Sequence, residues 1–230
     1  MKVLAINGSP RKAATAHVLG IFLEGVKEAG AEVELIRLAK LNVKPCRGCF
    51  TCWTNTPGEC IQKDDMEKML PKIDAADALV LATPVYVDGM TGIMKNFLDR
   101  AIPLDSGKVI IREGHCRHPS RSGGGMGKVA LMSVCGFHEM DNFDPLVTHV
   151  KALCKNMNAE FVGAVLRPYA WALSALPERG IDVSDVVEAI RNAGRQLVEN
   201  GKFEEATLAT ISRELIPQEI VAQLISSQFK

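Results

Sequence analysis

The chain has 230 residues, 47% of them hydrophobic, and its 27 basic side chains balance 27 acidic ones. A net charge of zero gives no reason to expect nucleic acid or an anionic membrane surface as a partner. The N-terminal apolar stretch is too short for a signal peptide, and no apolar run approaches the roughly 20 residues of a membrane span. We therefore expect a soluble, cytoplasmic protein with reduced cysteines.

Strand and helix patterns alternate from the N-terminus. Lys2–Asn7 and residues 33–36 predict two short strands, with a helix between them whose apolar residues recur at helical spacing. Asp77–Thr83 is almost wholly apolar, which indicates a strand buried on both faces. Lys128–Val134 and Glu160–Leu166 predict the fourth and fifth strands.

The remaining periodic segments are helical. One helix opens at the acidic pair Asp64-Asp65, where an N-cap is expected, and others cover residues 93–98, 144–156 and 182–199. Alternating strands and helices indicate an α/β fold with a parallel sheet covered on both faces. Five strands suit the doubly wound order 2-1-3-4-5, whose ligand crevice lies at the carboxyl ends of strands 1 and 3.

Two segments fall outside this pattern. The long connection Pro103–Gly127 is of a length that is usually functional or mobile. Residues 1–201 are expected to form one domain, and residues 202–230 a C-terminal helical extension with an apolar stripe. The stripe either packs on its own domain or embraces another subunit, and we favour the second. It consists of Leu215, Ile216, Ile220, Val221, Leu224 and Ile225.

The loop at residues 45–61 contains Cys46, Cys49, Cys52 and Cys60 in the spacing C-x2-C-x2-C-x7-C. Runs of this kind hold iron–sulfur clusters. A structural zinc site remains an alternative, although its cysteines usually come as two separate C-x2–4-C pairs, and a loop without metal is a third interpretation. We favour a single cubane cluster.

The other cysteines are isolated. Cys135 and Cys154 are expected to be small buried hydrophobes. The segment His115-Cys116-Arg117-His118 is a weaker candidate for a metal site. We favour a basic loop over the active site, in which Arg112, Arg117 and Arg121 meet an acidic electron-transfer partner or a substrate phosphate.

The loop after the first strand has the composition of a phosphate site. Ser9 and Thr15 offer hydroxyls, Arg11 and Lys12 offer charge, and the following helix directs free N–H groups at the site. The loop lacks both the G-x-G-x-x-G and the P-loop patterns, so a terminal monophosphate fits better than a triphosphate. A polar loop without a ligand is the alternative.

Two further loops reach the same edge of the sheet. Pro84–Val87 presents an extended backbone and the ring of Tyr86, and Ser133–Phe137 forms a small-residue turn that a planar ring can approach. Tyr86 as a core aromatic is the alternative. Its place after a strand's carboxyl end favours ligand contact. His17 and His138 are candidate proton donors near this site, although ordinary polar packing is as plausible for them.

Together, Gly8-Ser9-Pro10-Arg11-Lys12, Pro84-Val85-Tyr86 and the cysteine run resemble the iron–sulfur flavoprotein family, over about the first 170 residues. This family belongs to the flavodoxin-like, FMN-reductase-type flavoproteins. The resemblance implies a flavodoxin-like fold, one FMN and one 4Fe–4S cluster per subunit, a homodimer or homotetramer, and electron exchange with ferredoxin-like partners. Reduction of oxygen or peroxide is its proposed role.

Carried over by position, the resemblance puts FMN contacts on three loops and the cluster on the four cysteines of residues 45–61. The expected FMN contacts are Ser9, Arg11, Lys12, Thr15, Ala16, Pro84, Val85, Tyr86, Val87, Ser133, Cys135 and Gly136. The chain departs from the family where Ala14-Thr15-Ala16 replaces the common Gly-Asn-Thr, which removes one side-chain donor. Pro103–Gly127 has no counterpart that we can assign.

The two expected sites have a functional relation. The cysteine loop follows strand 2, next to strand 1, so cluster and flavin should share one edge of the subunit or meet across a subunit contact. Burial by Phe50 and Trp53 should tune the cluster. We expect an FMN and iron–sulfur redox enzyme. The alternatives are an NAD(P)H-dependent FMN or quinone reductase with non-redox cysteines, and a non-enzymatic electron carrier.

Overall fold

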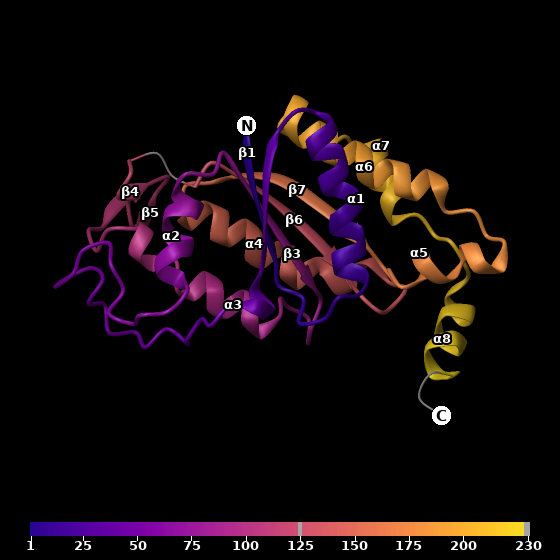
Figure 1. Cartoon of the computed structure of the whole chain (residues 1–230), viewed down its shortest axis with the longest axis horizontal. Coiled ribbons are helices and arrows are strands. Elements are labelled where there is room, and N and C mark those ends of the chain that lie inside the picture. Colours follow the sequence, from indigo (N-terminus) through magenta and orange to yellow (C-terminus); the bar gives the residue numbers. More distant parts are fainter. Residues whose placement is uncertain (124–125, 228–230) are drawn as a thin grey trace.

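The computed structural model describes residues 1–123 and 126–227. Its centre is a five-stranded parallel sheet in the order β2-β1-β3-β6-β7 (Figure 1). Because β4 and β5 belong to an insertion, this is the order 2-1-3-4-5 expected for the flavodoxin-like fold, which is confirmed. The strands are β1 Lys2–Asn7, β2 Glu32–Arg37, β3 Ala78–Pro84, β6 Lys128–Val134 and β7 Glu160–Arg167.

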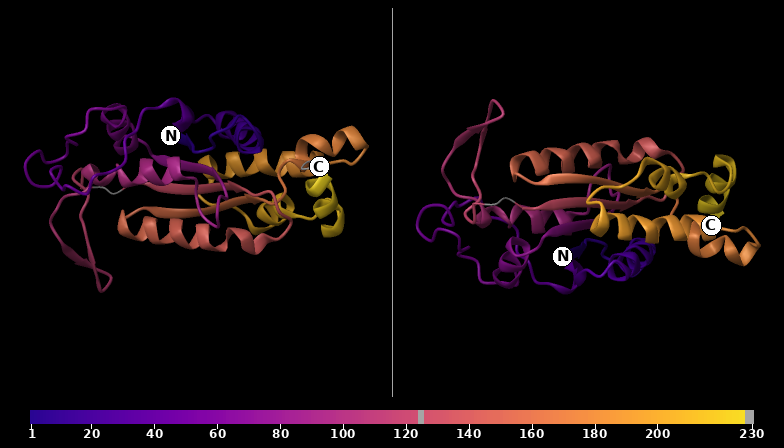
Figure 2. Two further views of the ribbon diagram at one scale, coloured as in Figure 1. Left: turned by 90° about the horizontal axis from the view of Figure 1, so that it is seen from below. Right: turned by 90° about the horizontal axis from the view of Figure 1, so that it is seen from above.

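Helices cover both faces of the sheet, so the molecule has three layers (Figure 2). Side chains alternate along each strand: Val3 and Ala5 of β1 face one apolar core, and Leu4 and Ile6 face the other. The first core is closed by α1 Ala14–Glu28, α6 Ser184–Glu199 and α7 Glu205–Ser212, and the second by α2 Met66–Asp74, α3 Gly92–Asp99 and α4 Asp144–Asn156.

Helices α1 and α6 approach closely because each places a glycine at the contact. A Cβ on Gly25 would lie 1.8 Å from the carbonyl oxygen of Arg191, and one on Gly194 would lie 2.1 Å from that of Phe22. We expect Gly25→Ala to lower the free energy of unfolding by about 1–3 kcal/mol or more, because the helices must move apart.

Gly20 on the same helix is the matched control, since a Cβ added there would have no neighbouring atom within 4 Å. Gly20→Ala should raise the free energy of unfolding by roughly 0.5–1 kcal/mol through helix propensity alone. Urea unfolding of both variants checks this, and equal effects would contradict the close helix contact.

The insertion between α3 and β6 projects from the body as a hairpin of β4 Ile110–Arg112 and β5 His115–Arg117 (Figure 2). Gly124 and Gly125 of the Pro103–Gly127 connection lie outside the described residues. The short elements are η1 Leu38–Lys40, η2 Ile102–Leu104, η3 Met140–Phe143, α5 Ala172–Ala175 and η4 Pro177–Arg179.

The C-terminal segment ends with α8 Gln218–Ser227 and packs on its own domain. Ile216 and Val221 are buried in the core that α1 and α6 share. The buried Arg167 donates from Nη1 to the carbonyls of Ile211 and Arg213, both at 2.8 Å. Most of the apolar stripe therefore packs within the chain, which is the alternative that we did not favour. Ile220 is exposed, and a contact with another subunit stays a prediction. No helix of the described residues has the length and apolar character needed to span a membrane.

Candidate functional site

A pocket of about 690 Å³ opens at the carboxyl edge of the sheet, within the size range of small-molecule and cofactor sites. The loops after β1, β3, β6 and β7 line it. Nine of the expected FMN contacts gather there from three of these loops: Ser9, Arg11, Lys12, Thr15, Pro84, Val85, Tyr86, Cys135 and Gly136.

The phosphate-loop part of this pocket is an uncapped helix N-terminus. The N-cap of α1 is Ala13, which has extended φ and ψ angles and offers no side-chain hydrogen bond to the first turn. The Ser9 amide donates to Asn7 Oδ1 at 2.8 Å, which holds the start of the loop. Arg11 and Lys12 are exposed at the pocket wall. Free N–H groups together with two cations form a site for an anion.

Three expected contacts do not line the pocket. Ser133 is buried and donates its hydroxyl to the Thr83 carbonyl at 2.8 Å, so it braces β3 against β6. Ala16 lies in the first turn of α1 beside the lining residue Thr15. Val87 is fully exposed at the tip of the loop after β3.

The loop after β3 is a tight turn. Tyr86 and Gly89 exchange backbone hydrogen bonds of 2.9 and 3.1 Å, and Val87 and Asp88 between them have φ angles of 47° and 59°. A positive φ is unusual for a β-branched residue, and such strain is often found at functional sites. The turn presents Tyr86 with its side chain 40% exposed, which rules out a core role for this ring.

Sequence reasoning missed part of the pocket wall. Trp171 and Ser174 come from the segment after β7, and Ile225 comes from α8 at the far end of the chain. The Trp171 indole donates to the carbonyl of Gly136 at 3.3 Å and so joins the loops after β6 and β7. The apolar pattern of α8 was visible, but nothing local indicated that the chain returns to this edge.

A second, smaller pocket is lined by Cys46, Cys49, Cys52 and Cys60. Cys52 is buried, Cys60 is half-buried and the other two are exposed. Among the described residues, no three His, Cys, Asp or Glu side chains converge closely enough to hold one metal ion. A cubane places its four thiolates on four separate irons, so it requires a shared pocket rather than convergence on one point. The donor set fits such a cluster.

A hydrogen bond and burial modulate two of these thiols. The Thr51 hydroxyl donates to Cys49 Sγ at 3.3 Å, and this contact lowers the pKa of the Cys49 thiol. Burial raises the pKa of the Cys52 thiol. Outside the loop, burial raises the pKa of Cys154 to about 11, which agrees with its expected role as a small buried hydrophobe. Cys135 is also buried, but it lines the carboxyl-edge pocket.

An ion pair closes the base of the cysteine loop. Arg100 donates to both carboxyl oxygens of Asp64, at 2.6 and 3.1 Å, and to the carbonyl of Lys44 at 2.6 Å. Asp64 also accepts from the amides of Lys44 and Met66. Asp64 thus satisfies the first amide of α2, whose N-cap is Asp65, and joins both ends of the loop. The sequence favoured a capping role for the acidic pair over a metal or substrate contact. Arg100 was missed because its partners lie 36 and more positions away.

This pair predicts an acid-sensitive loop. Burial raises the pKa of Asp64, but hydrogen bonds from Arg100 and from the Lys44 and Met66 amides outweigh it, so the pKa is lowered overall. A lowered pKa contributes stability that is present above the unfolded value of about 3.9. That stability is lost as pH falls through the folded pKa. We expect amide-exchange protection of residues 44–64, corrected for the intrinsic pH effect, to disappear there.

The Asp64→Asn variant is the control for this pH dependence. Leaving Arg100 buried without its carboxylate should cost about 3–5 kcal/mol, so the loop of the variant should exchange equally fast at all pH values. A wild-type loop that keeps its protection below the folded pKa would contradict the structural role of the pair.

The 103–127 insertion packs on the cysteine loop rather than over the carboxyl-edge pocket, where we expected a basic lid. The ring centroids of His118 and Trp53 lie 4.4 Å apart, and the Trp53 indole donates to the Ile102 carbonyl at 2.9 Å. Arg121 donates to the carbonyl of Cys52 at 3.0 Å. Phe50 is 51% exposed, so Trp53 rather than Phe50 anchors this loop.

The histidines and Cys116 that were candidates for a metal site or for proton transfer lie as follows. His118 Nδ1 lies 2.9 Å from the Lys108 carbonyl oxygen, and His115 and Cys116 are exposed on the hairpin. His138 stacks on Tyr169 and does not line the carboxyl-edge pocket, whereas His17 does.

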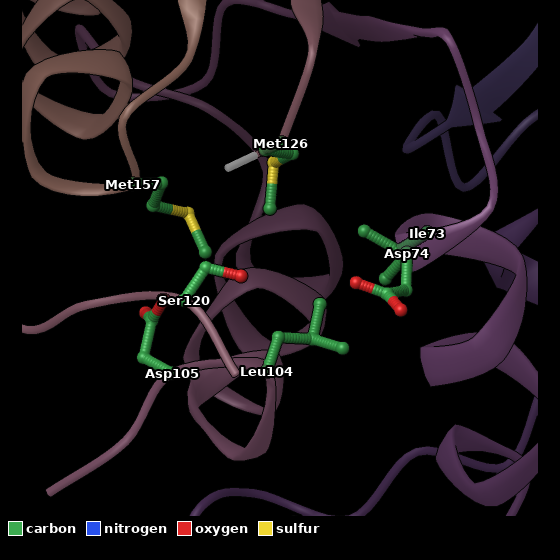
Figure 3. Close-up of a pocket in the computed structure, with 7 residues that line it drawn as sticks. All are labelled: Ile73, Asp74, Leu104, Asp105, Ser120, Met126 and Met157. Carbon is green, nitrogen blue, oxygen red and sulfur yellow. The ribbon is translucent and has the colours of Figure 1, made fainter. Parts of the chain in front are cut away.

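A further cavity of about 10 Å³ lies where the insertion meets α2 and the end of α4. Met126 and Met157 point into it, beside Leu104 and Ser120 (Figure 3). Such a space holds about one water molecule, so the cavity belongs to the packing of the insertion. Burial raises the pKa of Asp105 at its edge.

Helix α3 runs between the loop that follows β1 and the cysteine loop. At its N-terminus, Thr91 Oγ1 donates to the Gly8 carbonyl at 2.6 Å, and at its C-terminal end Arg100 contacts Cys60. Eight residues of α-helix are about 12 Å long. The carboxyl-edge pocket and the pocket of the four cysteines share no lining residue, and the cysteine loop extends away from the carboxyl edge (Figure 1). Both loops leave the carboxyl edge, because β1 and β2 are parallel and end together at Asn7 and Arg37, and the expectation that cluster and flavin share one edge stays a prediction.

Comparison with known proteins shows the family of the chain. The family model of NADPH-dependent FMN reductases matches residues 1–150, which contain the β1 and β3 loops and the cysteine run. The chain belongs to the NADPH-dependent FMN reductase family. This FMN reductase family member has the flavodoxin-like fold of solved relatives. A flavone reductase matches 86% of this chain and 62% of its own with a TM-score of 0.61 and 23% identity.

Curated relatives of this FMN reductase family member have a more specific name than the family. An "Iron-sulfur flavoprotein" of Archaeoglobus fulgidus is 48% identical over 101 residues, 44% of this chain and 49% of the relative. One from Methanocaldococcus jannaschii is 38% identical over 108 residues, 46% of this chain and 55% of the relative. The chain spans about half the length of the curated relatives it matches. The resemblance to iron–sulfur flavoproteins is confirmed.

Among solved structures, an FMN-dependent NADH-azoreductase from Bacillus anthracis in complex with FMN matches 86% of this chain and 99% of its own. The TM-score is 0.62 and the identity 16%. At this identity the match shows the shared fold of the FMN reductase family member and no more.

Proposed function

We propose that the chain binds FMN in the carboxyl-edge pocket and a 4Fe–4S cluster in the cysteine pocket. In this proposal it is a flavin-dependent oxidoreductase that passes electrons between a ferredoxin-like donor and a small acceptor, such as oxygen or peroxide. The observation that carries the proposal is the uncapped α1 N-terminus with Arg11 and Lys12 at one end of a 690 Å³ pocket. Membership of the FMN reductase family supports it.

The chain's own residues have distinct tasks in this pocket. Arg11, Lys12 and the first-turn N–H groups of α1 neutralise a phosphate. Tyr86, Phe137 and Trp171 provide aromatic side chains on the pocket wall against which a planar ring can pack. His17 is the histidine among the lining residues and is the candidate to exchange protons with a substrate. Bound FMN supplies one- and two-electron chemistry.

In the cysteine pocket, the four thiolates of residues 45–61 hold the cluster, which supplies one-electron transfer. Trp53 and Ile102 fix the loop on the body, and the ion pair at its base holds both ends. Electron exchange between the two pockets would run along one edge of the subunit or across a subunit contact in a homodimer or homotetramer.

A second candidate is an NAD(P)H-dependent FMN or quinone reductase in which the cysteines have no redox role. The family match favours it directly. A non-enzymatic electron carrier is the third, and turnover of any acceptor would argue against it.

Anaerobic stopped-flow reduction distinguishes the first two candidates. If the proposal is correct, a reduced ferredoxin-type donor bleaches the flavin faster than NAD(P)H does, and it bleaches the broad cluster absorbance as well. Rapid flavin bleaching by NAD(P)H alone, with no response from a ferredoxin-type donor, would support the reductase instead.

A further inference from the structure

Arg100 is a buried cation whose side chain reaches a cysteine of the proposed cluster site. Its side chain is 1% exposed, and Nη2 donates to Cys60 Sγ at 3.4 Å. Arginine is almost never fully buried unless it is paired, and this one follows directly after the C-terminus of α3. Its position therefore calls for an explanation beyond packing.

The partners of Arg100 fix the direction of its guanidinium. The two bonds to Asp64 form a bidentate pair, and Nη1 also reaches the Lys44 carbonyl. A planar fork held on two sides has little freedom. Nη2 is consequently aimed at Cys60, on the wall of the cysteine pocket that Arg100 itself lines. Within the described chain, Nε is buried and has no hydrogen-bond partner.

We propose that Arg100 is a positioning residue that sets the reduction potential of the cluster through Cys60. The inference rests on the proposed function. An N–H donor on a ligand sulfur stabilises negative charge there, and accepting one electron makes a cluster more negative. Asp64 offsets much of the long-range charge of Arg100 but leaves the direct N–H···S contact intact. Arg100 therefore raises the potential, which favours uptake of an electron from the donor.

The test replaces the planar guanidinium of Arg100 with another cation. Arg100→Lys retains a cation but cannot bond Asp64 and Cys60 in the same planar geometry. Arg47→Lys is the matched control, because Arg47 lines the same pocket but is exposed and has no hydrogen bond to a cysteine sulfur in the structure. Iron and sulfide per chain are measured first, and the cluster is then titrated anaerobically with dithionite and monitored by EPR.

We expect both variants to hold a full cluster. In Arg100→Lys the equilibrium constant for one-electron reduction should fall by about threefold to about tenfold, which corresponds to the net contribution of one ordinary hydrogen bond. Arg47→Lys should match the wild type. Equal potentials in all three proteins would overturn the inference, and a wild type without iron would instead refute the proposed function.

A second measurement does not depend on the folding of Arg100→Lys. Wild-type protein carrying guanidino-15N arginine is reduced and studied by pulsed EPR. A 15N hyperfine coupling to the cluster that persists in Arg47→Lys supports the direct contact from Arg100. Absence of any such coupling in a reduced, iron-replete wild type overturns the inference, even if Arg100→Lys fails to fold.

Discussion

The Ala13→Asp variant should gain stability and lose FMN. Ala13 is the N-cap of α1, its backbone is already extended, and no side chain caps the helix. An aspartate there would accept hydrogen bonds from the first turn and add about 0.5–2 kcal/mol to the free energy of unfolding of the apoprotein. The same carboxylate would occupy the anion site and repel a phosphate, so FMN affinity should fall between about tenfold and about 100-fold.

The variant should raise the free energy of unfolding and lower the FMN affinity, and these opposite changes make the prediction discriminating. Thermal unfolding of the apoprotein and fluorescence titration with FMN measure the two effects separately. Ala13→Ser is the matched control, because serine caps the helix without adding a charge, and its FMN affinity should remain within a few-fold of wild type. If Ala13→Asp binds FMN as tightly as wild type, the phosphate does not lie at this helix.

The second large effect concerns the cysteine loop. Cys49→Ser should remove the iron but leave the FMN, because the cysteine pocket and the carboxyl-edge pocket have no lining residue in common. Cys49 is exposed, so the substitution costs little packing energy. Iron per chain should fall from about four to below about one, while the flavin-to-protein ratio stays unchanged.

Cys116→Ser is the control, since Cys116 is also exposed but lies on the projecting β4–β5 hairpin. Both variants are purified anaerobically and assayed for iron, sulfide and flavin together. Equal loss of iron in both, or full retention of iron in Cys49→Ser, would show that the four-cysteine run does not hold the cluster.

The main fold was predictable because each layer leaves a local pattern. The apolar run of β3 and the helical spacing along α1 and α6 appear directly in the sequence, and parallel connections leave few topologies. The path of the last segment was not predictable. Ile216 and Val221 fill a core that also contains residues as distant in the sequence as Val3 and Leu19, and only tertiary packing shows whether an apolar stripe meets its own domain.

The candidate site was predictable to the extent that it follows strand ends. Ser9, Tyr86 and Gly136 meet in one pocket because parallel strands end at one edge. Ser133 was expected to contact FMN, but the pocket lining begins one residue later, at Val134. Neighbouring residues of a strand face opposite sides, and the Ser133 hydroxyl bonds to the Thr83 carbonyl of β3 instead. Arg100 was missed because a buried ion pair joins separate segments and leaves no local signature.

The most direct test of the account is composition of the anaerobically purified wild-type protein. Two independent cofactor sites, one formed by the α1 N-terminus and one by four thiols, predict about one FMN, four irons and four sulfides per chain. They also predict a broad absorbance beyond the flavin bands. A colourless protein that takes up neither FMN nor iron and sulfide on reconstitution would contradict the account.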